Sequence, residues 1–335
     1  MGVFPDWTWV MGFIFGASIG SFLNVVIYRL PRGLSLSNPP KSFCPKCKHS
    51  LELADLMPLL SWLLSKGRCR YCDEKVSSRY FFVELLTGSL WGAIWWRFLC
   101  EGSDPLGAGF FAAVSACLVA IIFIDWELYI IPDELNAILL FFSVAYHVFN
   151  RSLPVALTGA LLGWGLLWGI AFLGRVAFGK DAMGHGDIKM MRGVGALIGP
   201  LLLGASVALA VVAGLVIGLL IMAFTSKKKP ETAEGATPEE YLPPESIKSL
   251  VALGLWYLLC LDVIAVFYPQ MYTWLAKVLG EEIPEETFEE VENWTPTPTT
   301  IPFGPYLAIG ALVCMIIPGP IEKLILDYWK GAMGG

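Results

Sequence analysis

The hydrophobic positions of this chain gather into long unbroken runs, separated by shorter polar stretches. Runs of this length with few internal charges predict α-helices that lie within a membrane. Because a span needs roughly 20 residues, the shorter runs need flanking residues or tilt to cross. The runs are residues 8–28, 81–99, 108–124, 135–149, 155–172, 201–224, 250–267 and 306–317.

One more short helix is expected at residues 190–200, so the chain is predicted to contain eight or nine transmembrane helices. Composition supports this class, since 56% of the 335 residues are hydrophobic, 16% are charged and the mean hydropathy is +0.63. A soluble domain of this length needs far more polar surface, which excludes that class. The expected fold is therefore an all-α, polytopic helical membrane protein.

The charges around the first run predict its orientation. Asp6 precedes the run, whereas Arg29 and Arg32 follow it, which favours a retained helix with an outside N-terminus over a cleaved signal peptide. Residues 29–79 hold ten Lys and Arg against four Asp and Glu, a net charge of +6. Such loops remain in the cytoplasm. The basic residues are scattered, with no interleaved aromatic stripe, so no nucleic-acid partner is expected.

Residues 231–300 have the opposite character, with thirteen acidic residues against two Lys, a net charge of −11. This excess outweighs the net charge of −6 of the whole chain. A segment rich in Pro, Glu and Thr comes first, the apolar run 250–267 follows, and a second acidic segment occupies 281–292. We interpret residues 226–300 as an insertion between the last two helices. The charges do not decide whether residues 250–267 cross the membrane, lie on its surface or form a re-entrant segment.

Four cysteines form two C-x-x-C pairs inside the basic loop, separated by 21 residues. Thiolates at such a spacing can converge on one zinc ion in tetrahedral coordination, with Zn–S distances of about 2.3 Å. Iron or a redox dithiol is the alternative, whereas a reducing cytosol disfavours structural disulfides. The zinc is expected to hold together a small loop that has little core of its own. The predicted ligands are Cys44, Cys47, Cys69 and Cys72.

The other four cysteines lie in or beside apolar runs and are expected to behave as small buried hydrophobic residues. They are Cys100, Cys117, Cys260 and Cys314.

Two carboxylates stand at the ends of apolar segments. Asp125 follows the apolar segment 112–124, and Asp187 lies 62 residues later, just before the expected helix 190–200. Ionisable groups at membrane depth cost several kcal/mol and usually mark a functional site. Counting helices from the basic loop places both residues near the cytoplasmic face. The alternative is two unrelated interfacial residues that cap helices.

Two carboxylates held close together share a proton, so that one acts as base and the other as acid. The base draws a proton from a water that attacks a peptide carbonyl, and the acid protonates the leaving amine. Gly184 and Gly186 are expected to permit close approach and a positive φ. Lys189 is expected to hold the loop, bind a carbonyl or reach the interface.

Other catalytic sets lack support in the sequence. The only histidines are His49, His147 and His185, which lie in different segments, and His185 is interpreted as a polar residue in a tight loop. Neither a G-x-S-x-G elbow nor an H-E-x-x-H pair occurs, so the usual signatures of serine hydrolases and zinc proteases are missing.

Six sequence blocks, in order, resemble the type IV prepilin peptidase family of bifunctional leader peptidases and N-methyltransferases. Any block alone is modest evidence, but six in order are specific. The resemblance covers residues 20–224 and 301–317. The blocks are residues 20–31, the twin C-x-x-C pairs, Arg79-Tyr80 with Val83-Glu84-Leu85, Asp125 with Ile131-Pro132-Asp133, the G-x-G-D-x-K sequence 184–189, and residues 302–308.

The resemblance implies an intramembrane aspartyl endopeptidase that removes the basic leader of type IV prepilins or pseudopilins at the cytoplasmic face of the bacterial inner membrane. It assigns catalysis to Asp125 and Asp187. It also implies methylation of the new N-terminus, with S-adenosylmethionine as donor. No motif marks the donor site, so its residues stay unassigned, with the zinc loop as its expected neighbourhood. Asp133 is expected to cap the next helix rather than take part directly.

The expected organisation has five parts: the first transmembrane helix (1–30), the cytoplasmic zinc loop (31–79), the peptidase core (80–225), the acidic insertion (226–300), and the final transmembrane helix with the C-terminus (301–335). The insertion departs from the family, in which a short connection is usual. One hypothesis is that its acidic faces bind the basic leader. A peptidase without methyltransferase activity, or a proton-coupled transporter, is the alternative function.

Overall fold

The computed structural model describes residues 2–38, 41–44, 46–179, 182–225, 246–279 and 302–332. Among these residues the secondary structure is helical, apart from two isolated β-bridges in the loop after α1. The helices are α1 (Trp9–Arg29), α2 (Leu60–Leu64), α3 (Arg79–Trp95, continued by a π-helical segment, Trp96–Glu101), α4 (Pro105–Leu128), α5 (Asp133–Phe149), α6 (Leu153–Phe178), α7 (His185–Thr225), α8 (Ile247–Leu258), α9 (Leu261–Phe267), α10 (Gln270–Leu279), α12 (Gly304–Ile316) and α13 (Pro318–Ala332), with short 3₁₀ turns at Asp6–Thr8 and Leu53–Asp55.

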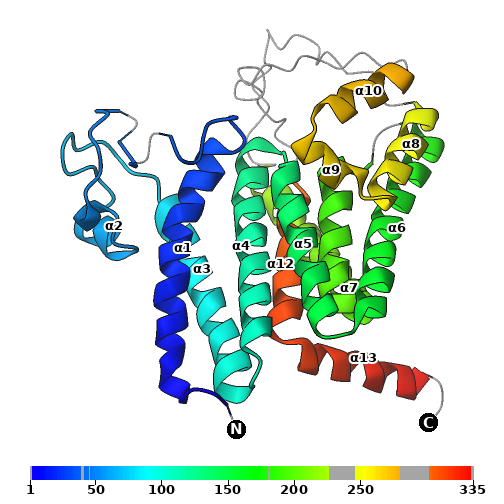
Figure 1. The fold of residues 1–335 in the computed structure, drawn as a ribbon, viewed down its shortest axis with the longest axis horizontal. Coiled ribbons are helices and arrows are strands. Elements are labelled where there is room, and N and C mark those ends of the chain that lie inside the picture. The colour runs from blue at the N-terminus through cyan, green and yellow to red at the C-terminus, as the bar shows by residue number, and fades with distance from the viewer. Residues whose placement is uncertain are drawn as a thin grey trace.

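The long helices stand side by side in a bundle, with α4 near its middle (Figure 1). α1 and α3 pack closely because glycines of α1 face α3: a β-carbon at Gly16 would lie 2.6 Å from the carbonyl oxygen of Thr87. One at Gly20 would lie 2.7 Å from the α-carbon of Glu84. Small residues four apart bring membrane helices into backbone contact in this way. The loop between α1 and α3 therefore leaves one end of the bundle, opposite the N-terminus (Figure 1).

α7 is two arms joined at a sharp break. Gly199 has φ 75° and ψ 175°, which a non-glycine residue rarely adopts, and Pro200 follows it. The arm 185–198 packs antiparallel to α6, since Gly195 lies against Gly159 and Met191 against Gly163. The arm 200–225 packs antiparallel to α12, with Ser206 against Gly310. The expected short helix after Asp187 is thus the first arm of α7.

The described residues contain four helices long and apolar enough to cross a membrane, or up to six if each bent pair counts as one span. This count does not confirm the expected eight or nine. α3 and α5 have 17 residues each, which corresponds to about 26 Å of helix, less than the hydrocarbon thickness of about 30 Å. In this count of candidate spans α7 is a single helix, although its two arms run in opposite directions. The polytopic, all-α class itself is confirmed.

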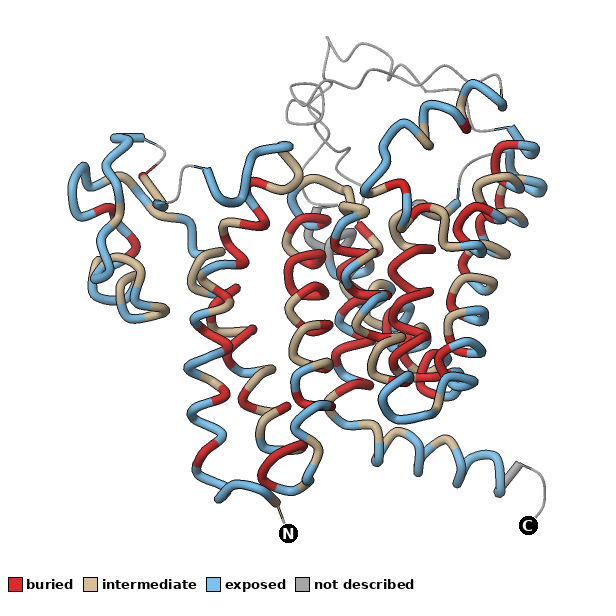
Figure 2. The backbone as a smooth tube through the Cα atoms, in the orientation of Figure 1, coloured by how far each residue is buried: buried red, intermediate tan, exposed pale blue. Residues whose placement is uncertain are grey.

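The burial pattern agrees with a lipid-embedded bundle (Figure 2). Side chains of α4 form the centre, where Leu118, Ile121 and Ile124 are fully buried. Large apolar side chains cover outward faces instead, such as Leu157 at 59% and Leu173 at 66% exposed on α6. An apolar surface of this extent suits lipid rather than water.

The apolar run 250–267 is a bent pair rather than a straight span. α8 descends antiparallel to α6, because Trp168 donates to the carbonyl of Leu250 and Trp164 to that of Gly254. α9 then turns by 82°, and α10 returns to the end of the bundle from which α8 came (Figure 1). The segment therefore enters and leaves on one side.

The last apolar run is α12, and a bend of 93° separates it from α13. α13 consequently runs across the end of the bundle where the N-terminus lies (Figure 1).

The acidic segments 230–244 and 281–292 lie outside the described residues, so the hypothesis that they bind a basic leader stays a prediction.

Candidate functional site

The two predicted aspartates meet at one end of the bundle. Asp125 is 6% exposed and lies in the last turn of α4, which ends when Tyr129 adopts the left-handed conformation and donates its N–H to the Asp125 carbonyl. Asp187 lies in the first turn of α7 and is partly buried. Their carboxylates converge on the first residue of α12, Gly304. Three helices distant in sequence thus build this site.

The surroundings of Gly304 show how close the two carboxylates lie to each other. A β-carbon at this position would lie 2.5 Å from Oδ2 of Asp125 and 3.1 Å from Oδ1 of Asp187. The two oxygens are therefore no further apart than the sum of these distances, and only a glycine leaves room for both. Oδ1 of Asp187 has no hydrogen-bond partner among the described residues. It is an acceptor available to a water or a substrate.

The glycines of the G-x-G-D-x-K sequence have different surroundings. A β-carbon at Gly186 would lie 2.8 Å from Cβ of Ile131, so Gly186 provides the close approach that was predicted. The side-chain amide of Asn136 donates to the Gly186 carbonyl at 3.3 Å and fixes this turn to α5. The prediction of a positive φ is wrong for Gly184 and Gly186, because neither is among the positive-φ residues. The reversal of the chain occurs earlier, at Gly179 (φ 66°).

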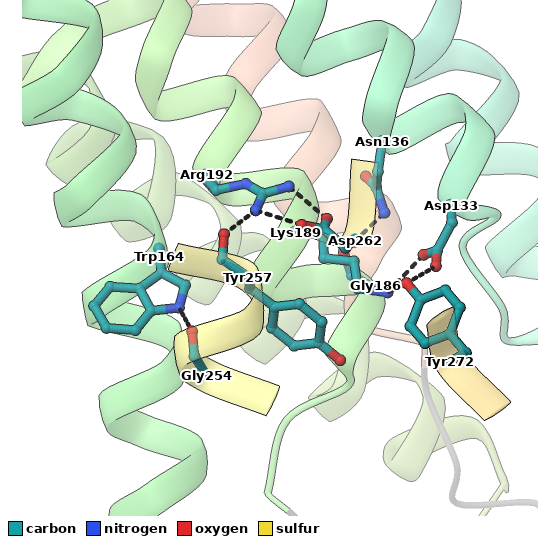
Figure 3. A network of polar contacts seen from close by, with 10 residues as sticks. All are labelled: Asp133, Asn136, Trp164, Gly186, Lys189, Arg192, Gly254, Tyr257, Asp262 and Tyr272. Atoms are coloured by element: carbon teal, nitrogen blue, oxygen red, sulfur yellow. Dashed lines mark hydrogen bonds and ion pairs between the residues drawn. The ribbon is translucent and has the colours of Figure 1, made fainter. Parts of the chain in front are cut away.

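Lys189 holds the site together rather than reaching the interface. Its buried ammonium group lies 2.7 Å from Oδ1 of Asp133, and Tyr272 of α10 donates its hydroxyl to Oδ2 of Asp133 at 2.7 Å (Figure 3). The prediction that Asp133 caps α5 is wrong, since Pro132 occupies the cap position and no side-chain cap bond is present. The carboxylate is used instead as the partner of Lys189 and fixes the start of α5 to α7.

A second ionic contact joins the same arm of α7 to the bent pair. The guanidinium of Arg192 donates to both oxygens of Asp262, at 2.9 and 2.6 Å, and also to the carbonyl of Tyr257 (Figure 3). The Arg192 and Asp262 side chains are 3% and 4% exposed. Removing one partner of such a pair costs about 3–5 kcal/mol, because the other charge stays buried. The bent pair is therefore part of the site's support.

Three of these positioning residues were not predicted from the sequence: Gly304, Arg192 and Asp262. Gly304 belonged to one of the six blocks, but nothing local indicated that it faces the aspartates. Arg192 and Asp262 each interrupt an apolar segment, and this intramembrane charge was the signal that could have identified them. His185 is the first residue of α7, and its ring packs edge-on against Tyr257 at 5.7 Å.

The four loop cysteines come together away from the aspartates. Their sulfur atoms all lie within 4.8 Å of one another, and Sγ of Cys44 is 3.9 Å from Sγ of Cys72. Each C-x-x-C pair sits in a tight turn closed by a β-bridge, with a positive φ at the residue after the second cysteine, Lys48 or Asp73. The two turns therefore have the same local geometry and face each other.

These residues fit a tetrahedral zinc ion. Four sulfurs around zinc lie about 3.8 Å apart, given Zn–S bonds of about 2.3 Å, which agrees with the observed cluster. Burial opposes ionisation of the Cys44 thiol, but backbone N–H groups of Cys47 and Lys46 lower its pKa to about 7. A thiolate is the form that binds metal. The surrounding turns thus favour the ligand state of at least this cysteine.

We expect the purified protein to carry one zinc ion per chain, and Cys44→Ser or Cys69→Ser to lose it. The loop has few buried residues of its own, so metal loss should also make residues 31–79 more sensitive to protease. Metal analysis and limited proteolysis measure both effects. Cys260→Ser, a thiol outside the cluster, is the matched control. Full zinc content in both cluster variants would contradict the assignment.

Of the remaining cysteines, three are buried as expected: Cys100, Cys117 and Cys314. Cys260 differs, since it is only partly buried and has φ 55° at the bend between α8 and α9.

Comparisons with known proteins agree with this arrangement. Residues 14–98 match the model of the bacterial peptidase A24 N-terminal domain, and residues 112–219 match that of the type IV leader peptidase family. A prepilin leader peptidase/N-methyltransferase of Myxococcus xanthus is 32% identical over 325 residues, which cover 94% of this chain and 91% of the relative. The chain belongs to the type IV leader peptidase family.

Other members of the family match a shorter part of the chain. The prepilin leader peptidase/N-methyltransferase of Aeromonas salmonicida is 35% identical over 248 residues, 65% of this chain and 83% of the relative. That of Klebsiella pneumoniae is 34% identical over 195 residues, 56% of this chain and 83% of the relative. The Myxococcus xanthus match, by contrast, extends across residues 226–300. No solved structure matches the chain.

Proposed function

We propose that this chain is an intramembrane aspartyl endopeptidase that removes the leader of type IV prepilins or pseudopilins and then methylates the new N-terminus. The observation that carries the proposal is the convergence of Asp125 and Asp187 on Gly304. The names of the family members, which combine leader peptidase and N-methyltransferase, support both activities. Membership of this family also favours the peptidase over the transporter alternative.

The proposed mechanism follows from the paired carboxylates. Two such groups in a poorly solvated site cannot both ionise easily, so they share one proton. The ionised carboxylate takes a proton from water, whose oxygen attacks the carbonyl carbon of the scissile bond. The protonated one donates to the leaving nitrogen as the C–N bond breaks. We assign the roles to the pair rather than to either residue, because their titration is shared.

The proposed orientation places the pair at the cytoplasmic face of the bacterial inner membrane. The basic loop leaves the bundle at the end where α4 ends, and loops with this excess of Lys and Arg remain in the cytoplasm. A substrate whose leader is basic and cytoplasmic, and whose next segment is a hydrophobic helix, presents its cleavage site at that level. In this proposal the substrate also contacts the acidic insertion, residues 226–300, and the membrane lipids.

In this proposal zinc is structural. Cys44, Cys47, Cys69 and Cys72 would hold it, and it would keep the two turns of the loop together beside α1 and α3. No step of the peptidase reaction requires it, since the carboxylates supply both proton transfers.

The test is to incubate the full chain in liposomes with a prepilin and to analyse the product by mass spectrometry. We expect loss of the leader and, when S-adenosylmethionine is present, the mass of one added methyl group at the new N-terminus. An intact prepilin would contradict the peptidase, and a cleaved but unmethylated product would leave the peptidase-only alternative.

A further inference from the structure

The helix α13 contributes no residue to the aspartate site or to the zinc cluster. It begins directly after α12, where Ile317 leaves the helical conformation (φ −124°, ψ 54°) and Pro318 has no N–H to continue the hydrogen bonds of the helix. The resulting bend of 93° sends α13 across the end of the bundle (Figure 1). Because α12 runs along the bundle, α13 lies parallel to the membrane surface.

Contacts with other helices fix this direction. The guanidinium of Arg97, in the π-helical segment that continues α3, donates to the carbonyl of Met315 and, at 3.5 Å, to that of Ile316. These are the last carbonyls of α12, which have no partner within their own helix. α13 also packs against α7. The bundle therefore sets the course of α13.

The sequence of α13 separates apolar from charged positions. Ile321, Leu324, Ile325 and Tyr328 recur at intervals of three and four residues, so they share one face. Trp329 lies at the edge of this apolar face. The charged residues lie outside it and, as two acids and two lysines, give the helix no net charge: Glu322, Lys323, Asp327 and Lys330.

Protein covers only part of the apolar face. Ile321 and Ile325 are half-buried, which orients the face toward the bundle and hence toward the membrane interior. Leu324 and Tyr328 on the same face are 72% and 74% exposed. Large apolar side chains at this exposure are unfavourable in water. An apolar medium beside the bundle would cover them.

Aromatic side chains place the membrane–water boundary at this end of the bundle. Trp7 and Trp9, at the start of α1, are 70% and 45% exposed, and Trp96, at the end of α3, is 45% exposed. Exposed indole rings of membrane proteins gather at the level of the lipid headgroups. α13 presents Tyr328 and Trp329 at the same end of the bundle (Figure 1). The depth of α13 thus matches that of the headgroups.

We propose that α13 is an interfacial helix that binds the lipid surface at this end of the bundle, in the leaflet opposite the zinc loop. Leu324 and Tyr328 contact the upper part of the acyl chains, whereas Lys323 and Lys330 face water. Burial of apolar side chains supplies the binding, since the helix has no net charge, so zwitterionic lipids suffice. Because α12 joins α13 to Gly304, this lipid contact holds the far end of the helix that meets the aspartates.

Fluorescence quenching in liposomes tests the placement with two matched variants of the full chain. Tyr328→Cys lies on the apolar face and Lys330→Cys on the charged side, and both side chains are exposed in the protein itself. A difference between them therefore reports what surrounds the helix. Each variant is labelled with bimane, a small thiol-reactive fluorophore, and reconstituted in phosphatidylcholine. The quencher is either bromine on the acyl chains or iodide in the water on both sides.

We expect brominated chains to quench the label on Tyr328→Cys at least about threefold more than that on Lys330→Cys, and iodide to show the reverse order. Leu324→Cys should behave like Tyr328→Cys and provides the test if the latter does not fold, which thermal unfolding shows. The unmodified chain, labelled in the same way, gives the background of the native cysteines.

Two results would overturn the proposal. Equal quenching by iodide on the apolar and the charged side would show that the apolar face of α13 lies in water. Shielding of the label on the apolar face from both quenchers would show that protein, such as a second copy of the chain, covers it instead of lipid.

Discussion

Asp125→Asn and Asp187→Asn should each reduce leader cleavage by about 10³-fold or more, with the protein still folded. Asparagine keeps the size of the side chain but cannot exchange a proton, and positioned acid–base groups contribute about 10²–10⁴-fold to rate. Because the two carboxylates act as a unit on a single water, losing either should cost nearly as much as losing both. Single-turnover cleavage of a prepilin in liposomes, followed by gel or mass spectrometry, measures the effect.

Asp6→Asn is the control for this pair, since Asp6 is exposed and lies before α1 at the opposite end of the bundle. It should cleave like the unmodified protein. The double variant Asp125→Asn/Asp187→Asn should be no slower than the slower single variant. Cleavage that survives in either single variant would remove that aspartate from the mechanism.

Asp262→Asn should lower the thermal stability of the membrane domain strongly, by about 3–5 kcal/mol, and slow cleavage with it. The substitution leaves the guanidinium of Arg192 buried without its counter-charge, and breaking a buried pair costs that much. Arg192 lies five residues after Asp187 on the same arm of α7, so loosening this contact disturbs the arm that presents the aspartate. Thermal unfolding in detergent and the cleavage rate are the two measurements.

Two controls make this prediction specific. Asp73→Asn removes an exposed pair with Arg68, whose side chains are 77% and 49% exposed, and should cost less than about 1 kcal/mol. Arg192→Met/Asp262→Leu replaces both buried charges by apolar groups and should recover much of the lost stability. If Asp262→Asn were as stable as the unmodified chain, the bent pair would not support the site.

Several features followed from the sequence because their signals are local. Long apolar runs set the helical, membrane-embedded class, since backbone groups in lipid must be satisfied within each helix. The C-x-x-C spacing predicted the cysteine cluster, because two tight turns need only a short loop to meet. Asp125 and Asp187 stood out because a carboxylate beside an apolar segment is costly and therefore rare.

Other features depended on contacts between distant segments. The apolar pattern of residues 185–225 does not reveal that the chain reverses at Gly199, because lipid-facing and helix-facing positions are both apolar. Asp133 looked like a helix cap from its position after Pro132, yet its partners are Lys189 and Tyr272, the latter 139 positions away. Charge counting on the insertion could not show that its apolar part bends back against α6 and α7.

The sequence by itself determined the class of fold, the cysteine cluster and the two aspartates, since each depends on residue type and on spacing within one segment. Only the tertiary structure decided that the aspartates meet at Gly304, that the bent pair supports α7 through Asp262, and that α13 runs across the end of the bundle. The physical reason is that helix packing, not local propensity, sets which side chains face one another. A buried charge such as Asp262 shows in the sequence, but its partner is chosen by the fold.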